Sequence, residues 1–419
     1  MKSSIVDVFN PRTIVRVSLL SGNIACTYAI GMIHGESVAG EFVRLMAGVL
    51  LAATLIRFGL AKNLIKHASA IKKAPNIGFP LAIDSIVASS YVFGLLVVPS
   101  TLLSYFLGWN FLYLILVLIS GFLISASTIL GYLIRTFDKP LSSVFFESGG
   151  LYYILMIIYF SLHFYDSEPN GLLLILASTF LLLLLAIYTA HEFSPNSFRD
   201  TVRACFVIRR VRSPIRLLAN SAGTLLSELC AVGSNSVVYL FAGAVADDAL
   251  IYKLRMIERI VAFSLVGQSI TSTFKMALLS RHIYSHSLSI STFQLLKSIG
   301  RQNVRFAIVL LLPLLAVSAL AVKLPPSTHL MVFLLLAFSS LVSAIFGPIG
   351  NAMVFALSPF KLVIGNILIL MLVILSVYLA FLLDTWISIP LAICLSVVVR
   401  NVSSYLLLKV HSSTRFIPK

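Results

Sequence analysis

Long apolar stretches separated by short polar breaks run through the whole chain. Each stretch has about the length of a membrane-spanning helix, which uses about 20 mostly apolar residues. The breaks collect charged residues, Pro, Gly and Asn, which interrupt apolar helices. Twelve stretches are predicted as spans, near 14–33, 40–60, 81–103, 111–134, 141–162, 171–190, 215–240, 250–272, 303–323, 329–355, 362–383 and 386–408.

The stretches are continuously apolar and lack the alternation of a β-barrel strand. We therefore expect an all-α integral membrane protein with about 12 transmembrane helices. Composition agrees, because 59% of the 419 residues are hydrophobic and only 11% are charged. A soluble domain carries roughly 25% charged residues, so a soluble globular protein is excluded.

The distribution of Lys and Arg predicts the orientation of the chain in the membrane. The net charge is +16, from 31 basic and 15 acidic residues. Nearly all basic loop residues fall in the segments on one side of the predicted spans, and the opposite loops hold only Lys323 against six acidic residues. Basic loops stay in the cytoplasm. We expect a multi-pass membrane protein with both termini cytoplasmic, and no nucleic-acid partner.

A long basic connection divides the predicted spans into two sets of six. We expect an N-terminal lobe over 1–192, a cytoplasmic linker over 193–213 and a C-terminal lobe over 214–419. In the linker, Arg199, Arg203 and Arg210 recur at helical spacing, which fits a short amphipathic helix and equally a solvated basic loop. The segment GESVAGEFVRLM (35–46) is similar to AVADDALIYKLRM (244–256), which indicates a repeat of the six-span unit.

Sequence signatures of soluble enzymes are lacking. The chain contains no GxxxxGK[ST] phosphate loop, no HExxH pair and no GxSxG elbow. The predicted outer loops are too short to hold a sugar-transferring site. We therefore expect a protein that is not an enzyme, with no metal and no cofactor.

Charged residues inside predicted spans are the candidates for function, because charge in hydrocarbon costs several kcal/mol unless it is paired or lines a polar cavity. Span eight holds Lys253, Arg255, Glu258 and Arg259, and Arg259 is expected near the midplane. Arg255 and Arg259 share a helix face, and Glu258 lies three residues from Arg255, so an internal ion pair is expected.

Glu228 in span seven is predicted at a depth similar to that of Arg259. A structural ion pair between the two and a role for Glu228 in ion coupling both fit the sequence. Arg44 in span two corresponds, by the repeat, to the Lys253–Arg255 region. Four further charged residues carry less weight because they lie shallower or have no predicted partner: Asp84, Glu147, Arg57 and Arg400.

The arginines favour an anionic cargo. The guanidinium group matches the oxygens of phosphate and stays charged when it is desolvated, whereas it repels a hydrophobic amine. Arg44, Lys253, Arg255 and Arg259 are therefore predicted to line a cationic cavity that suits phosphate, and Glu228 and Glu258 to couple ions or pair charges.

The whole chain resembles the polysaccharide flippases of the multidrug/oligosaccharidyl-lipid/polysaccharide exporter superfamily, particularly the Wzx-type O-antigen flippases. The resemblance rests on the six-plus-six spans, on GESVAGEF (35–42) before span two, on RFGLAKNLIK (57–66) at its end, and on SPFK (358–361) leading to Gly365 and Asn366. It implies a V-shaped transporter of two six-helix lobes in the bacterial inner membrane. This transporter moves a polyprenyl-pyrophosphate-linked oligosaccharide to the outer leaflet by alternating access, and the resemblance implies that the cationic cavity binds its pyrophosphate.

The resemblance also implies partners and alternatives. The expected partners are the lipid-linked oligosaccharide, membrane lipids and, as a candidate, a polysaccharide polymerase or chain-length regulator. No cofactor is implied beyond coupling to protons or sodium ions. A cation-coupled multidrug exporter of the same superfamily is the first alternative, but such exporters commonly carry an acid in the first span, and 14–33 contains none. A membrane-embedded polysaccharide polymerase or glycosyltransferase is the alternative from another class.

Overall fold

The computed structural model describes residues 11–66, 78–107, 110–137, 140–163, 170–193, 214–268, 279, 283 and 290–413. These residues form helices and short turns, and no strand occurs among them. The predicted all-α class is thus confirmed. Most of the predicted linker, with its amphipathic helix, lies outside the described residues.

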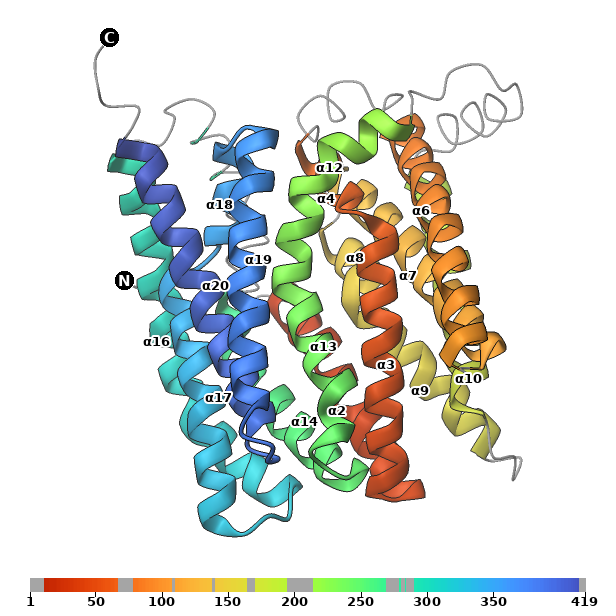
Figure 1. The fold of residues 1–419 in the computed structure, drawn as a ribbon, viewed down its shortest axis with the longest axis vertical. Helices are drawn as coiled ribbons and strands as arrows, with labels where there is room; N and C mark the ends of the chain where they lie inside the picture. Colours follow the sequence, from red (N-terminus) through yellow and green to blue (C-terminus); the bar gives the residue numbers. More distant parts are fainter. Residues whose placement is uncertain are drawn as a thin grey trace. The chain divides into compact units, whose positions relative to one another are not determined.

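The helices of the N-terminal part follow the first six predicted spans, with the fifth span divided among three consecutive elements (Figure 1). They are α2 (Pro11–His34), α3 (Glu36–Arg57), α4 (Leu60–Lys66), α6 (Gly78–Leu107), α7 (Phe111–Thr136), α8 (Pro140–Val144), the π-helix η2 (Phe145–Gly149), α9 (Gly150–His163) and α10 (Gly171–Phe193).

The helices of the C-terminal part follow the remaining six spans, several of them interrupted. They are α12 (Pro214–Glu228), the π-helix η3 (Leu229–Gly233), α13 (Ser234–Phe241), the 3₁₀ turn η4 (Ala242–Ala244), α14 (Asp248–Ala262), the 3₁₀ turn η5 (Phe263–Leu265), α16 (Ile290–Ala321), α17 (Pro326–Phe346), α18 (Ile349–Ala356), α19 (Pro359–Phe381) and α20 (Ser388–Ser413).

Among the described residues, eight helices are long and apolar enough to cross a membrane. The segments Ile215–Val232 and Asn235–Ala244 meet the same criteria together and are bent by 52° relative to each other. The chain is a multi-pass membrane protein. The bend coincides with the π-helix η3, and a wide turn of this kind is a recognised cause of helix kinks.

Span eight differs from its prediction as one apolar helix over 250–272. The α-helix α14 has only 15 residues and passes into the 3₁₀ turn η5. With this length α14 is too short to qualify as a span, and Lys253, Arg255, Glu258 and Arg259 also interrupt its apolar sequence. Span nine is longer than predicted, because α16 begins at Ile290, 13 residues before the predicted start at 303.

Packing groups the chain into two compact units. The first comprises Met1–Cys26 and Gly48–Leu225, and the second comprises Thr27–Ala47 and Leu226–Lys419. The segment Thr27–Ala47, called the tip below, contains the end of α2 and the start of α3 and belongs to the second unit. This grouping differs from the expected lobes at 1–192 and 214–419, whose six-plus-six division stays a prediction.

In the first unit, α7 packs against α4, α6 and α10. The buried face of α7 includes several small residues, among them Ser120, Gly121 and Ser125. Small residues allow helix backbones to approach closely in a membrane, where packing rather than the hydrophobic effect drives association. At Gly121 an added Cβ would lie 2.9 Å from both the Cβ of Ala52 and the backbone nitrogen of Ala53.

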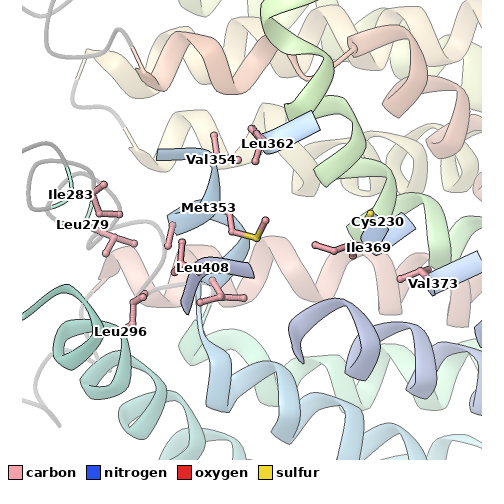
Figure 2. Packing of buried hydrophobic residues seen from close by; sticks show 12 residues of the cluster. Cys230, Leu279, Ile283, Leu296, Met353, Val354, Leu362, Ile369, Val373 and Leu408 are labelled. Atoms are coloured by element: carbon pink, nitrogen blue, oxygen red, sulfur yellow. The ribbon is translucent and has the colours of Figure 1, made fainter. Parts of the chain in front are cut away.

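In the second unit, α20 packs against α17 and α19, and α16 packs against α17. Met353 of α18 lies in a buried apolar cluster with Leu296 of α16, Ile369 of α19 and Leu408 of α20 (Figure 2). The break between α17 and α18 falls at Gly347, whose φ of 57° suits glycine, and at the following Pro348. The predicted tenth span therefore consists of two helices.

The close approach at Gly121 predicts a position-specific loss of stability. Gly121→Val should destabilise the protein by about 1–3 kcal/mol, because the backbone of α3 cannot yield to a new side chain as a flexible side chain would. Thermal unfolding of the purified protein in detergent measures the effect. Gly94→Val in α6 is the matched control, because nothing lies within 4 Å of a Cβ added there. Equal losses in the two variants would contradict the packing described for α7.

Candidate functional site

The second unit contains seven of the ten charged residues predicted to matter for function. They are Arg44, Glu228, Lys253, Arg255, Glu258, Arg259 and Arg400. The other three, Arg57, Asp84 and Glu147, belong to the first unit, at the end of α3, within α6 and within the π-helix η2. The structure therefore groups the predicted site residues of the tip, α12, α14 and α20 in one unit.

A helix cap fixes the start of α14. The side chain of Asp247 accepts a hydrogen bond of 2.8 Å from the backbone N–H of Leu250. Asp247 is thus the N-cap residue, and Asp248 occupies the first turn, where a negative charge also interacts favourably with the helix dipole. The sequence AVADDAL is a turn followed by a capped helix start, and the cap positions Asp248 at the helix terminus.

Two ion pairs join the tip to α14. Arg44 Nε lies 2.9 Å from Asp248 Oδ1, and Arg44 Nη2 donates a hydrogen bond of 3.0 Å to Asp248 Oδ2. Lys253 Nζ lies 2.8 Å from Glu36 Oε2. The pairs are reciprocal, because the tip supplies the base of one and the acid of the other.

Two glycines allow the backbone of the tip to pack closely against α14. A Cβ at Gly40 would lie 1.8 Å from the carbonyl oxygen of Asp248, which excludes any other residue in this arrangement. A Cβ at Gly31 would lie 2.6 Å from the hydroxyl of Tyr252. The ion pairs thus lie beside a contact that small residues make possible.

A more deeply buried cluster lies further along α14. Arg255 Nη1 donates a hydrogen bond of 2.5 Å to Glu258 Oε2, and the two side chains are only 12% and 11% exposed. Tyr239 of α13 donates a hydrogen bond of 3.0 Å to the same Glu258 oxygen. The Arg255 guanidinium carbon lies 4.4 Å from the centre of the Tyr239 ring, a cation–π distance. The predicted ion pair within α14 is confirmed.

Three of the four basic residues that were predicted to line a cationic cavity are paired with carboxylates. Arg44, Lys253 and Arg255 each face a carboxylate. The acidic partners Glu36 and Asp248 were not predicted, because the sequence places both in outer turns. The similarity of 35–46 to 244–256 was the available signal, since it places an acidic turn before a basic residue in both repeats. Their proximity depends on the packing of the tip against α14.

The remaining predicted residues of the second unit lie on three helices. Arg259 is half-buried, one turn beyond Arg255 on α14. Glu228, the last residue of α12, is 4% exposed. The predicted pair between Glu228 and Arg259 stays a prediction.

The π-helix η3 provides contacts for Arg400 of α20. Arg400 Nη1 donates hydrogen bonds of 3.3 Å to the carbonyl oxygen of Cys230 and 3.2 Å to that of Ala231. Both carbonyls belong to η3, whose wide turn departs from regular α-helical hydrogen bonding. The sequence predicted no partner for Arg400, because π-helices have no reliable sequence signal.

Comparison with solved structures found matches over nearly the whole chain. The MATE transporter VcmN of Vibrio cholerae, as a mutant, is 12% identical, with a TM-score of 0.58 and coverage of 96% of this chain and 95% of that chain. An outward-facing MATE multidrug resistance transporter of the MOP superfamily is 12% identical, with a TM-score of 0.59 and coverage of 97% and 95%.

The lipid II flippase MurJ, in an inward closed conformation, is 13% identical, with a TM-score of 0.56 and coverage of 96% of this chain and 87% of that chain. Comparison of the sequence with protein-family models and with curated proteins found no match. At such low identity the likeness shows the fold. The chain has the all-helical fold shared by MATE transporters and MurJ.

The cluster around Glu258 predicts strong coupling between its members. Arg255→Ala or Glu258→Ala should each destabilise the protein by about 3–5 kcal/mol, because each leaves a buried charge without its partner. The double variant should lose at least about 1 kcal/mol less than the sum of the two. Unfolding titrations with SDS in mixed micelles measure the cycle. Arg301→Ala on the exposed face of α16 is the control, and strictly additive losses would contradict the pairing.

Proposed function

We propose that this protein is a flippase for a polyprenyl-pyrophosphate-linked oligosaccharide, such as an O-antigen repeat unit. It moves this substrate from the cytoplasmic to the outer leaflet of the bacterial inner membrane by alternating access. The shared fold supports a transporter, because the matched proteins include both multidrug transporters and a lipid II flippase and each match covers at least 96% of this chain. The fold does not determine the class of cargo, which depends on the side chains of the site.

The acidic residues around α14 carry the argument for an anionic cargo. A hydrophobic amine needs an available carboxylate, but Glu36, Asp248 and Glu258 are already engaged by Lys253, Arg44 and Arg255. In addition, α2 contains no Asp or Glu, whereas drug exporters of this superfamily commonly carry an acid in their first span. Both observations favour the lipid-linked oligosaccharide over a cationic drug.

The ion pairs provide a way to bind pyrophosphate without leaving buried charge unpaired. Phosphate oxygens can replace a carboxylate as the acceptor of guanidinium or ammonium hydrogen bonds. Arg44 and Lys253 would exchange Asp248 and Glu36 for the cargo, and Arg259 would contribute a further guanidinium. In the unloaded protein the carboxylates hold the basic side chains in position, so that binding exchanges one set of anionic partners for another.

Ion coupling by Glu228, the orientation of the chain and a protein partner complete the proposed function. Glu228, buried at the end of α12, is the proposed carrier of a coupling proton or sodium ion. Both termini are placed in the cytoplasm, in keeping with the Lys and Arg bias of the loops. A polysaccharide polymerase or chain-length regulator is the proposed protein partner, since it would consume the translocated product.

A cation-coupled multidrug exporter is the second candidate. The matches to MATE transporters support it, and the buried carboxyl of Glu228 could serve cation coupling there as well. The two candidates differ in the charge of the cargo. Transport of an anionic lipid-linked sugar and of a cationic dye therefore separates them.

Reconstitution of the full chain into liposomes tests the proposal. The chain should equilibrate a labelled polyprenyl-pyrophosphate oligosaccharide between leaflets, measured as the fraction of sugar that an added glycosidase can reach. Arg259→Gln should slow this about ten-fold or more, because a hydrogen bond to a charged group contributes about 1.5–3 kcal/mol. An imposed proton or sodium gradient should accelerate flipping, and Glu228→Gln should remove that acceleration.

Arg301→Gln is the matched control, because Arg301 is an exposed arginine on another helix of the same unit and should flip the lipid at the wild-type rate. Transport of ethidium with no movement of the lipid-linked sugar would replace the flippase by the exporter. Elongation of the sugar without translocation would instead identify a polymerase.

A further inference from the structure

The second unit contains a partly open cavity of about 130 Å³ that the proposed transport does not use. Its wall comes from η3, α13, α14, η5, α17 and α20 and is made of apolar and polar residues in similar proportion. Six polar residues contribute to it: Asn235, Glu258, Ser339, Ser340, Ser343 and Arg400. A cavity of this size has room for several water molecules or for a small ion with part of its hydration.

Arg400 gives the cavity a positive charge that is not paired with an acidic residue of the described chain. Its hydrogen bonds go to the neutral carbonyls of Cys230 and Ala231. Within the part of the chain that the structure describes, no carboxylate lies within ion-pair distance of Arg400. A guanidinium in an apolar environment stays charged, so it needs a counter-charge or water.

Glu258 does not supply this counter-charge. Its Oε2 atom accepts the hydrogen bonds of both Arg255 and Tyr239, which join it to a basic partner on its own helix. The pair of Arg255 and Glu258 is neutral as a unit. The cavity therefore keeps the charge of Arg400 as its net charge.

Asn235 adds a polar group without a partner. Its buried Oδ1 atom has no hydrogen-bond partner within the described chain. A half-turn of the amide would point the NH₂ group in the same direction, where it could donate to an anion. Ser340, a buried hydroxyl on the wall of the same cavity, is a second neutral donor. A guanidinium, an amide and a hydroxyl are together a donor set suited to an anion.

We propose that this cavity is a binding site for a small monovalent anion, with chloride as the physiological ligand. One monovalent ion balances the single uncompensated charge of Arg400. A divalent oxyanion would leave one negative charge without a partner away from bulk water, which is costly, and a cation would add to the positive charge already present. The bound anion links α20 to α13 and α17, so it stabilises the second unit.

The experiment uses the purified full chain in lipid nanodiscs. Replacing gluconate by chloride at constant sodium and ionic strength should raise the thermal unfolding midpoint of the wild-type protein in a saturable way. Arg400→Gln should lose this response, and Asn235→Ala should weaken the apparent chloride affinity about ten-fold. Arg301→Gln, the exposed control on α16, should respond like the wild type.

A direct measurement keeps the test independent of how the variants fold. Bromide soaked into crystals of the wild-type protein should give an anomalous peak beside Arg400 and Asn235. A wild-type protein without a saturable response, a folded Arg400→Gln variant that responds equally, or bromide bound only elsewhere would overturn the proposal. Phosphate that stabilises the protein as well as chloride does would overturn the monovalent assignment.

Discussion

Basic side chains in a largely apolar protein require hydrogen-bonding or acidic partners. The arrangement of the second unit follows from which groups serve as these partners. Arg44 reaches Asp248 and Lys253 reaches Glu36 because the tip lies against the start of α14. Gly40 makes that approach possible, since any larger residue would collide with the carbonyl of Asp248. The tip continues into the first unit at both of its ends, so α2 and α3 each belong partly to one unit and partly to the other.

The same requirement accounts for irregular helices in this unit. Glu258 is the acid within α14 that pairs with Arg255. Its charge, together with the neighbouring basic residues, makes α14 the least apolar of the predicted spans. For Arg400 the partners are carbonyl groups of the π-helix η3, where the chain also bends by 52°. Buried charge and distorted backbone thus occur together, as expected where polar groups inside a membrane protein must be satisfied internally.

Features that depend on a local pattern could be predicted from the sequence. Continuous apolar runs predict the helices, and the spacing of Arg255 and Glu258 predicts their ion pair. The partners of Arg44, Lys253 and Arg400 were not predictable, because each pair joins segments distant in the chain through tertiary packing. The break at Gly347–Pro348 had a local signal, but the 3₁₀ turn after α14 and the two π-helices had none. The cavity beside Arg400 depends on six elements at once and has no sequence signature.

An exchange of charges between Arg44 and Asp248 tests most directly whether reciprocal ion pairs hold the tip on α14. Arg44→Asp and Asp248→Arg should each lower the thermal unfolding midpoint, because each replaces an ion pair by two like charges that face each other. With both substitutions present, opposite charges face each other again, and most of the loss should be recovered. A double variant that loses as much as the two single variants together would contradict this account of the second unit.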